Sequence, residues 1–293
     1  MDQQPIRIGN QTAYHCPACI PYEFAIRNAF DAFEWFSDKG QSGWCEDDMN
    51  QDKRYEIRRQ GQAADLHFSV HAPHAADPTT TVGTAAILRS IRFAEDVGAK
   101  IVNLHLFPAH SPERFADSLI ALLEPAQRAA VRLTIENTPQ TSPEDFNALF
   151  GILSGVSAAV GWVGMCLDMG HANLFAGTRN DYVRFVDRLA EHVPVLHWHA
   201  HENWGDRDSH LTLFTGPSAR DERGVRELAR RLLWKGFEGS VILEQWPHPP
   251  ELLVETRDRL HVVLGSLQAE QHSRSARKPF WAEKADAAGR PRG

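Results

Sequence analysis

A histidine-rich segment around residue 200 holds the residues of this 293-residue chain that are best suited to chemistry. His197, His199 and His201 alternate along an apolar segment, so in a β-strand their imidazoles would point to the same face. Asp208 and His210 follow in a short polar loop. Imidazole and carboxylate groups are the ligands that zinc, manganese, iron and cobalt sites use. The spacing therefore predicts a metal site at the end of a buried strand, provided that other strands end in the same way.

Other apolar segments of the chain do end in carboxylates and imidazoles. Glu136 directly follows Leu-Thr-Ile and Glu244 directly follows Val-Ile-Leu. A carboxylate buried at such a place is costly unless it is paired or bound to a metal. The complete set at the expected strand ends is His71, His105, Glu136, Asp168, His171, His199, Asp208, His210 and Glu244. His197, two residues before His199, is interpreted as a core or supporting histidine.

The elements that would position these residues alternate between strand and helix, the pattern of a parallel sheet with crossover helices. We expect strands at 11–16, 32–36, 66–71, 100–107, 131–136, 163–168, 193–199 and 240–244. We expect helices at 22–30, 53–60, 84–97, 112–130, 142–153, 181–190, 222–234 and 250–267. The glycine-rich phosphate loop of an open doubly wound sheet is missing after the first strand. The sequence thus predicts an α/β fold, a (β/α)8 TIM barrel, in which all strand ends converge on one mouth.

The composition is that of one globular domain, with 42% hydrophobic and 24% charged residues. We expect a single barrel domain over residues 1–270 and a disordered basic tail over residues 271–293. The net charge of −7 argues against a nonspecific polyanion binder, although it leaves a local basic groove for nucleic acid open. The sequence shows neither a long apolar run nor the features of a signal peptide, so we expect a cytoplasmic protein without a membrane span. It leaves open whether the chain forms a homo-oligomer.

Two cysteines near the N-terminus, Cys16 and Cys19, have the spacing of a redox motif or of half a zinc site. A structural zinc site needs four ligands, and this pair supplies two. We therefore favour no metal role for the pair. Cys166 lies within an apolar segment and is interpreted as a small core residue.

Five motifs together resemble those of the xylose isomerase-like barrel superfamily. They are IEN at 135–137, LDMGHA at 167–172, HAHEN at 199–203, RDSHL at 207–211 and LE at 243–244. The resemblance covers residues 14–267. The superfamily includes sugar-phosphate isomerases and epimerases, ketose 3-epimerases and endonuclease IV. As a set, the motifs are specific for the superfamily but say little about the substrate.

In the ketose-epimerase branch, the resemblance implies one divalent metal ion held by Glu136, Asp168, His199 and Glu244. The two glutamates would also act as acid and base. They would move a proton at the carbon beside a carbonyl, while the metal polarises the oxygens.

The same resemblance implies that His171 and Arg207 hold hydroxyl or carbonyl oxygens of the substrate. Trp204 and Trp246 lie beside the expected mouth. They are interpreted either as an aromatic wall for a sugar ring or as rim packing, because large aromatic residues dominate burial wherever they fall.

In the endonuclease IV branch, the resemblance implies three zinc ions on nine ligands, and all nine residues of the set above have a counterpart. Such a cluster generates a hydroxide and stabilises both oxygens of a phosphoryl displacement. The chain departs from that branch in the loop at 72–77, which lacks a tyrosine, and at Glu202, which replaces the usual Asp. These departures weaken the case for DNA cleavage more than the case for metal binding.

We therefore expect a metal-dependent isomerase or epimerase acting on a small sugar, sugar phosphate or keto-polyol. The alternatives are a multinuclear zinc phosphoesterase, such as an abasic-site nuclease or a small phosphodiester hydrolase, and a lyase or dehydratase acting on a keto-polyol. The cofactor would be Zn, Mn, Co, Mg or Fe. Nine ligands exceed what one ion coordinates, so we expect two or three ions if His71, His105, His171, Asp208 and His210 are ligands, and otherwise one.

Overall fold

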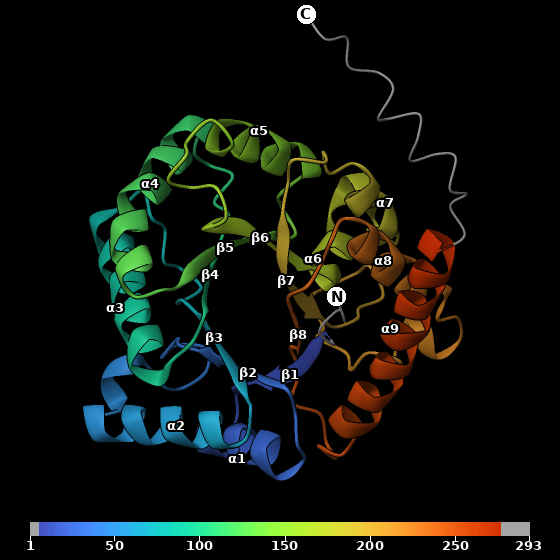
Figure 1. Ribbon diagram of the computed structural model, residues 1–293, viewed down its shortest axis with the longest axis horizontal. Coiled ribbons are helices and arrows are strands. Elements are labelled where there is room, and N and C mark those ends of the chain that lie inside the picture. Colours follow the sequence, from blue (N-terminus) through green and yellow to red (C-terminus); the bar gives the residue numbers. More distant parts are fainter. Residues whose placement is uncertain (1–5, 277–293) are drawn as a thin grey trace, which may run out of the picture.

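The computed structural model describes residues 6–276 and confirms the predicted barrel. Eight parallel strands follow one another around a closed barrel, with helices on its outside (Figure 1). The strands are β1 (Arg7–Gln11), β2 (Ala32–Phe36), β3 (His67–His71), β4 (Ile101–His105), β5 (Arg132–Glu136), β6 (Val163–Asp168), β7 (Val195–Ala200) and β8 (Ser240–Leu243). The barrel closes where β1 pairs with β8, in a register that places Ile8 opposite Val241.

The α-helices that cover the strands are α1 (Cys19–Arg27), α2 (Gln51–Ala63), α3 (Thr81–Val97), α4 (Pro112–Arg128), α5 (Pro143–Leu153), α6 (Met169–Leu174), α7 (Tyr182–Asp187), α8 (Arg223–Trp234) and α9 (Leu252–Ala276). Short 3₁₀ turns lie at Glu46–Asp48, Ala176–Thr178 and Pro217–Ala219. No helix among residues 6–276 has both the length and the apolar character needed to cross a membrane.

Strands β2, β4 and β6 are buried along their whole length, and each of the other five strands is buried at all but one residue. This burial is expected for a parallel barrel in which helices cover one face of the sheet and side chains fill the other. The outer layer packs through large apolar side chains. Trp35 of β2, for example, is fully buried and contacts Trp44 and Phe93 edge-on. This layer makes the sheet a rigid support for the groups at the mouth.

The first strand lies four residues earlier than predicted, at Arg7–Gln11 instead of 11–16. Gly9 explains the difference. A Cβ at this position would lie 2.2 Å from the carbonyl oxygen of Ala32, so only glycine allows β1 and β2 to approach this closely. Gly9 and Asn10 have low strand propensity, and this hid the strand from the sequence pattern.

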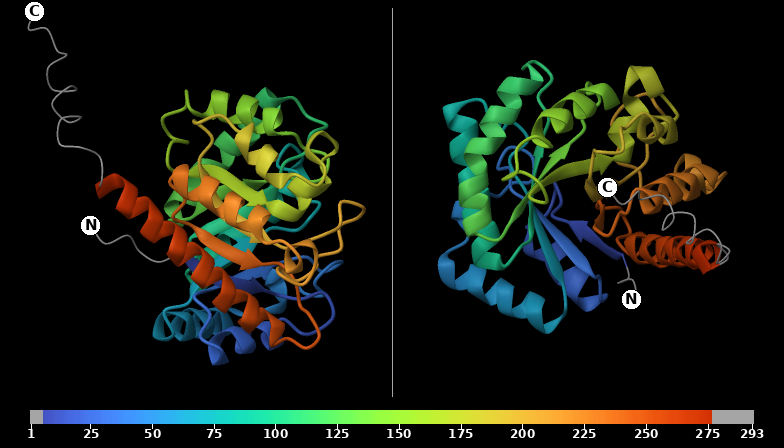
Figure 2. Two further views of the ribbon diagram at one scale, coloured as in Figure 1. Left: turned by 90° about the vertical axis from the view of Figure 1, so that its right-hand side faces the viewer. Right: turned by 45° about the horizontal axis from the view of Figure 1, so that its top comes forward.

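Two further boundaries differ from the prediction. The crossover from β6 to β7 holds two short helices, α6 and α7, where one helix at 181–190 was expected. The last helix continues to Ala276 along the outside of the barrel, six residues beyond the predicted end of the domain at 270 (Figure 2). Residues 277–293, which hold the rest of the predicted tail, lie outside the described residues.

The start of α5 is set by a capping box between Ser142 and Asp145. The hydroxyl of Ser142 accepts a hydrogen bond from the backbone N–H of Asp145, and the Asp145 carboxylate accepts one from the N–H of Ser142. Pro143 occupies the first helical position, where no N–H is needed.

We predict that Ser142→Ala lowers the free energy of unfolding by about 1 kcal/mol, because it leaves the first N–H groups of α5 without their cap. The measurement is the urea midpoint of the full-length protein. Ser118→Ala on the exposed face of α4 is the matched control, because the Ser118 hydroxyl only bonds back to the carbonyl of Arg114. Equal midpoints for the two variants would contradict the role of the cap.

Candidate metal centre

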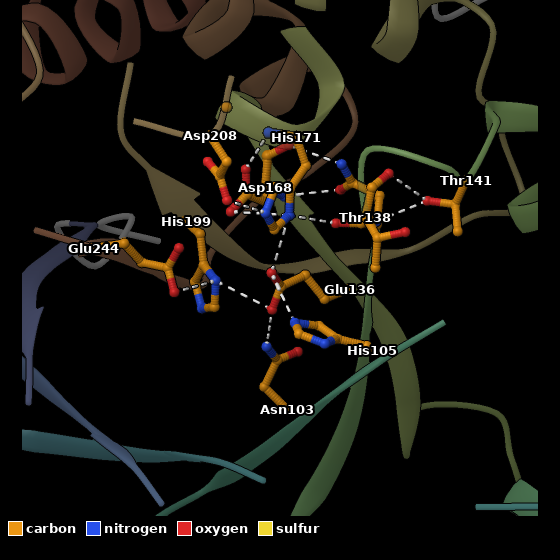
Figure 3. A network of polar contacts seen from close by, with 12 residues as sticks. Asn103, His105, Glu136, Thr138, Thr141, Asp168, His171, His199, Asp208 and Glu244 are labelled. Carbon is orange, nitrogen blue, oxygen red and sulfur yellow. Dashed lines mark hydrogen bonds and ion pairs between the residues drawn. The ribbon is translucent and has the colours of Figure 1, made fainter. Parts of the chain in front are cut away.

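Four side chains from four successive strand ends converge at the mouth of the barrel. Glu136 ends β5, Asp168 ends β6, His199 lies on β7 and Glu244 follows β8. Their ligand atoms all lie within 4.8 Å of one another, and all four residues are buried. Nδ1 of His199 is 3.2 Å from Oε2 of Glu136 and 3.1 Å from Oε1 of Glu244. We call these four residues the quartet, and Figure 3 shows their side chains pointing toward one another.

A second group shares Glu136 with the quartet. Nε2 of His71, at the end of β3, is 3.1 Å from Oε2 of Glu136, and Nε2 of His105, at the end of β4, is 3.5 Å from Oε1. The side-chain amide of Asn103 also donates a hydrogen bond to Oε2 of Glu136. Glu136 is therefore contacted by nitrogen atoms on both of its oxygens.

A third group is centred on Asp208 in the loop after β7. Oδ2 of Asp208 lies 3.1 Å from Nε2 of His171 and 3.1 Å from Nε2 of His210. His210 adopts a left-handed backbone conformation, with a φ of 41°, which is uncommon for a residue with a side chain. Such strain is typical of residues whose position is fixed by a functional site. We call these three residues the Asp208 group.

Four of the imidazoles are oriented by backbone carbonyls. Nδ1 of His71 is 2.7 Å from the carbonyl oxygen of Ala72, and Nδ1 of His105 is 3.3 Å from the carbonyl oxygen of His74. Nδ1 of His171 is 2.8 Å from the carbonyl oxygen of Asn137, and Nδ1 of His210 is 2.8 Å from the carbonyl oxygen of Glu244. A carbonyl only accepts, so each Nδ1 carries the proton and each Nε2 faces a carboxylate. This is the arrangement that supports metal-bound histidines, in which the second ring nitrogen is hydrogen-bonded.

The carboxylates and imidazoles of the site shift one another's pKa values. Burial alone would raise the pKa of Asp168, but the imidazoles of His171 and His201 lower this pKa to about 2. Burial would lower the pKa of His210, but the hydrogen bond to Asp208 and the charge of Glu244 raise it to about 9. The carboxylates therefore stay ionised in a buried place, where they need a positive partner.

The residues present fit one or more divalent ions. Carboxylate oxygens and imidazole nitrogens converge within coordination range, and the opposite ring nitrogens of four of these histidines, His71, His105, His171 and His210, are hydrogen-bonded. An ion bound among them would supply the positive charge and release protons from the imidazoles. The structure thus brings all nine predicted ligands together in three adjoining groups.

The comparisons with known proteins agree with this geometry. A family model described as "Xylose isomerase-like TIM barrel" matches residues 23–261. The chain belongs to this family. Among curated proteins it is 23% identical to the uncharacterized protein MJ1311 of Methanocaldococcus jannaschii over 204 residues, which are 61% of this chain and 64% of that protein. The chain thus spans just under two thirds of the length of this relative.

Several solved structures of similar fold are epimerases or epimerase-like proteins. A D-tagatose 3-epimerase-like protein superposes with a TM-score of 0.70 at 19% identity, covering 90% of this chain and 99% of that one. The 3-keto-D-glucoside 4-epimerase YcjR from E. coli superposes with a TM-score of 0.59 at 15% identity, covering 88% of this chain and 99% of that one. At these identities the likeness establishes the shared barrel fold.

Within this xylose isomerase-like barrel, the structure reveals a buried carboxylate that sequence reasoning missed. Glu34 of β2 is fully buried and accepts hydrogen bonds from Nε2 of His197, at 2.8 Å, and from the hydroxyl of Ser69, at 2.7 Å. Its other oxygen lies 3.0 Å from Nε2 of His199, out of line for a good hydrogen bond. His197 is thus a supporting histidine, as predicted. A glutamate inside an apolar strand was the available signal, because the same argument had singled out Glu136.

Three residues that the sequence analysis placed at a substrate, Arg207, Trp204 and Trp246, belong to none of the three groups described above. Arg207 is exposed, and among the described residues its guanidinium forms no ion pair. Trp204 is 51% exposed and lies beneath the guanidinium of Arg220, on the rim of a cavity of about 400 Å³ next to α7. Trp246 packs edge-on against Phe24, which favours the rim-packing interpretation for this residue. Their roles toward a substrate remain predictions.

Tyr14, in the loop after β1, borders the mouth and was not singled out from the sequence. Its ring lies 6.4 Å from that of His210 and 5.9 Å from that of Phe36. Burial, together with the charges of Glu244 and Asp208, raises the pKa of the Tyr14 hydroxyl above its usual value. The neutral hydroxyl is a candidate donor to a substrate oxygen. Cys16 in the same loop and Cys19 at the start of α1 have free thiols, and burial raises the pKa of Cys16, which disfavours a reactive thiolate there.

We predict that Glu136→Gln and Glu244→Gln each weaken zinc binding by about 100-fold or more, because an amide removes the ligand charge and losing even a supporting group costs up to this much. Competition with a chromophoric chelator measures the affinity. Glu113→Gln, at an exposed position of α4, serves as the control. Wild-type affinity in both site variants would contradict the assignment.

Proposed function

We propose that this protein is a divalent-metal-dependent isomerase or epimerase of a small sugar, sugar phosphate or keto-polyol. The observation that carries the proposal is the approach of two buried glutamates, Glu136 and Glu244, to the same nitrogen of His199. A substrate held at this point lies between two carboxylates. One carboxylate can remove a proton from the carbon beside a carbonyl, and the other can return a proton to the opposite face.

The two glutamates differ in how firmly their surroundings hold them. Both oxygens of Glu136 are contacted, by Asn103, His71, His105 and His199, so its position is fixed. Glu244 contacts His199 at 3.1 Å, whereas His201 and His210 lie 3.8 and 3.9 Å away. We infer that both glutamates carry protons, with Glu136 the more firmly held of the two and Glu244 the freer one.

The divalent ion, when bound, polarises the oxygens of the substrate. Its ligands would be the four residues of the quartet. His171 is held between the carbonyl of Asn137 and Asp208, so it is fixed where it can bind either an ion or a substrate oxygen. The epimerases among proteins of similar fold support a carbohydrate-like substrate, as does the family itself.

A second candidate function is phosphoester hydrolysis by a multinuclear centre. The observation that favours it is the Asp208 group, in which two imidazoles with fixed protons face one carboxylate beside the quartet. Two or more ions held in this way could contact both the attacking and the leaving oxygen of a phosphoryl displacement. The substrate of such an enzyme would be a small phosphodiester or, in an abasic-site nuclease, a nucleic acid.

We predict that the metal-loaded protein incorporates deuterium from D₂O into the product when it acts on a ketose, ketose phosphate or keto-glycoside. NMR of the reaction mixture detects the carbon-bound label. Glu244→Gln should lower the rate of exchange by about 100-fold or more, since general acid–base catalysis contributes this much.

A matched set of phosphomonoesters and phosphodiesters tests the second candidate. Release of an alcohol and a phosphate, with unlabelled carbon atoms in the product, would contradict the isomerase and support the phosphoesterase. Exchange that is equally fast in wild type and Glu244→Gln would contradict the role of this glutamate.

A further inference from the structure

His201, directly after β7, is fully buried between the quartet and the Asp208 group. Its Nε2 donates a hydrogen bond of 3.0 Å to Oδ2 of Asp168. The other oxygen of Asp168 accepts the backbone N–H of His171 at 2.6 Å, at the start of α6. Asp168 is therefore held by one donor on each oxygen, and His201 is the donor that comes from a side chain.

The face of the His201 ring supports a residue of the Asp208 group. The rings of His201 and His210 lie 4.0 Å apart between centroids, with an angle of 6° between their planes. An imidazole binds a metal through a lone pair in the plane of its ring. Because these two planes are parallel and stacked, the in-plane lone pairs of the two rings would not be directed at the same ion. His201 therefore does not complete the coordination of the ion that His210 would hold, even though its nitrogen is close to the Asp208 group.

The remaining nitrogen of His201 and the neighbouring Gly170 complete the surroundings of the ring. Nδ1 is buried without a hydrogen-bond partner and lies 3.9 Å from Oδ1 of Asp208. The ring has room only because residue 170 is glycine, since a Cβ there would lie 2.0–2.5 Å from the ring atoms of His201. The helix α6 and the strand β7 are thus packed so that this ring is held in one position.

We propose that His201 is a positioning residue that couples the two groups, holding Asp168 through its N–H and His210 through its ring face. The inference rests on the proposed metal centre. It assigns His201 a task distinct from that of the ligands around it. The two contacts use different parts of the side chain, so two substitutions can separate them.

His201→Phe keeps an aromatic face for His210 but removes the donor to Asp168. His201→Gln keeps an N–H group near the place of Nε2 but removes the stacked ring. The probe is Co²⁺ alone, added below saturation to crystals of the full-length protein, with the occupancy at each position read from anomalous diffraction. Titrations in solution give the affinities, and the visible bands of Co²⁺ report the ligand geometry. His272→Gln, at an exposed position of α9, is the control.

We expect His201→Phe to lower Co²⁺ affinity at the quartet by about 10-fold or more, the loss typical of an outer-shell partner, with smaller change at the Asp208 group. We expect His201→Gln to show the reverse pattern. Gly170→Ala should displace the ring and weaken both positions. Urea midpoints of the metal-free variants show whether any loss of affinity merely reflects a loss of stability.

Three results would overturn the inference. Wild-type affinity and spectra in both His201 variants would show that neither contact matters. Loss of one complete ion in both variants would show that His201 is itself a ligand. A wild-type protein that binds no Co²⁺ would overturn the proposed metal centre and this inference with it, whereas the first two results would leave the metal centre in place.

Discussion

The contacts between Glu136 and the imidazoles around it are the interaction on which the rest of the mouth depends. Glu136 is a buried carboxylate with His71 at 3.1 Å, His199 at 3.2 Å and His171 at 3.4 Å. Leaving such a group without positive charge would cost several kcal/mol, so the barrel must deliver compensating nitrogen atoms from several elements at once. A divalent ion meets the same requirement. The need of the buried Glu136 carboxylate for positive charge therefore explains the arrangement of the site without reference to a particular substrate.

The parallel barrel can meet this demand because it brings the ends of all its strands to one mouth. Strands β3, β4, β5, β6 and β7 each end in or near a ligand, and β8 is followed by one. Beneath them, Glu34 and His197 form a second buried polar layer between the site and the apolar barrel. Around them, backbone carbonyls fix the protons of the imidazoles before any ion arrives. The orientation of the histidines at the mouth is thus set by Glu34 and by backbone carbonyls.

Much of this arrangement could be predicted from the sequence, because strong local signals mark it. The apolar runs before Glu136 and Glu244 indicate strands whose ends are polar, and the barrel then brings these ends together. The first strand was misplaced because Gly9 is required by a close contact with Ala32, which a propensity pattern does not reveal. His201 appeared as one of three alternating histidines, but its stacking on His210 depends on a loop that folds back onto the strand end. The placement of Trp204 and Trp246 likewise depends on loop paths, which carry little periodic signal.

Whether the mouth of the barrel holds metal can be decided by anomalous diffraction from crystals of the zinc-loaded protein, recorded on both sides of the zinc edge. We expect one peak among Glu136, Asp168, His199 and Glu244 and a further peak beside Asp208, His171 and His210. A single peak at the quartet would contradict a multinuclear centre and leave the one-metal isomerase standing. No peak at the quartet would contradict the proposed metal centre.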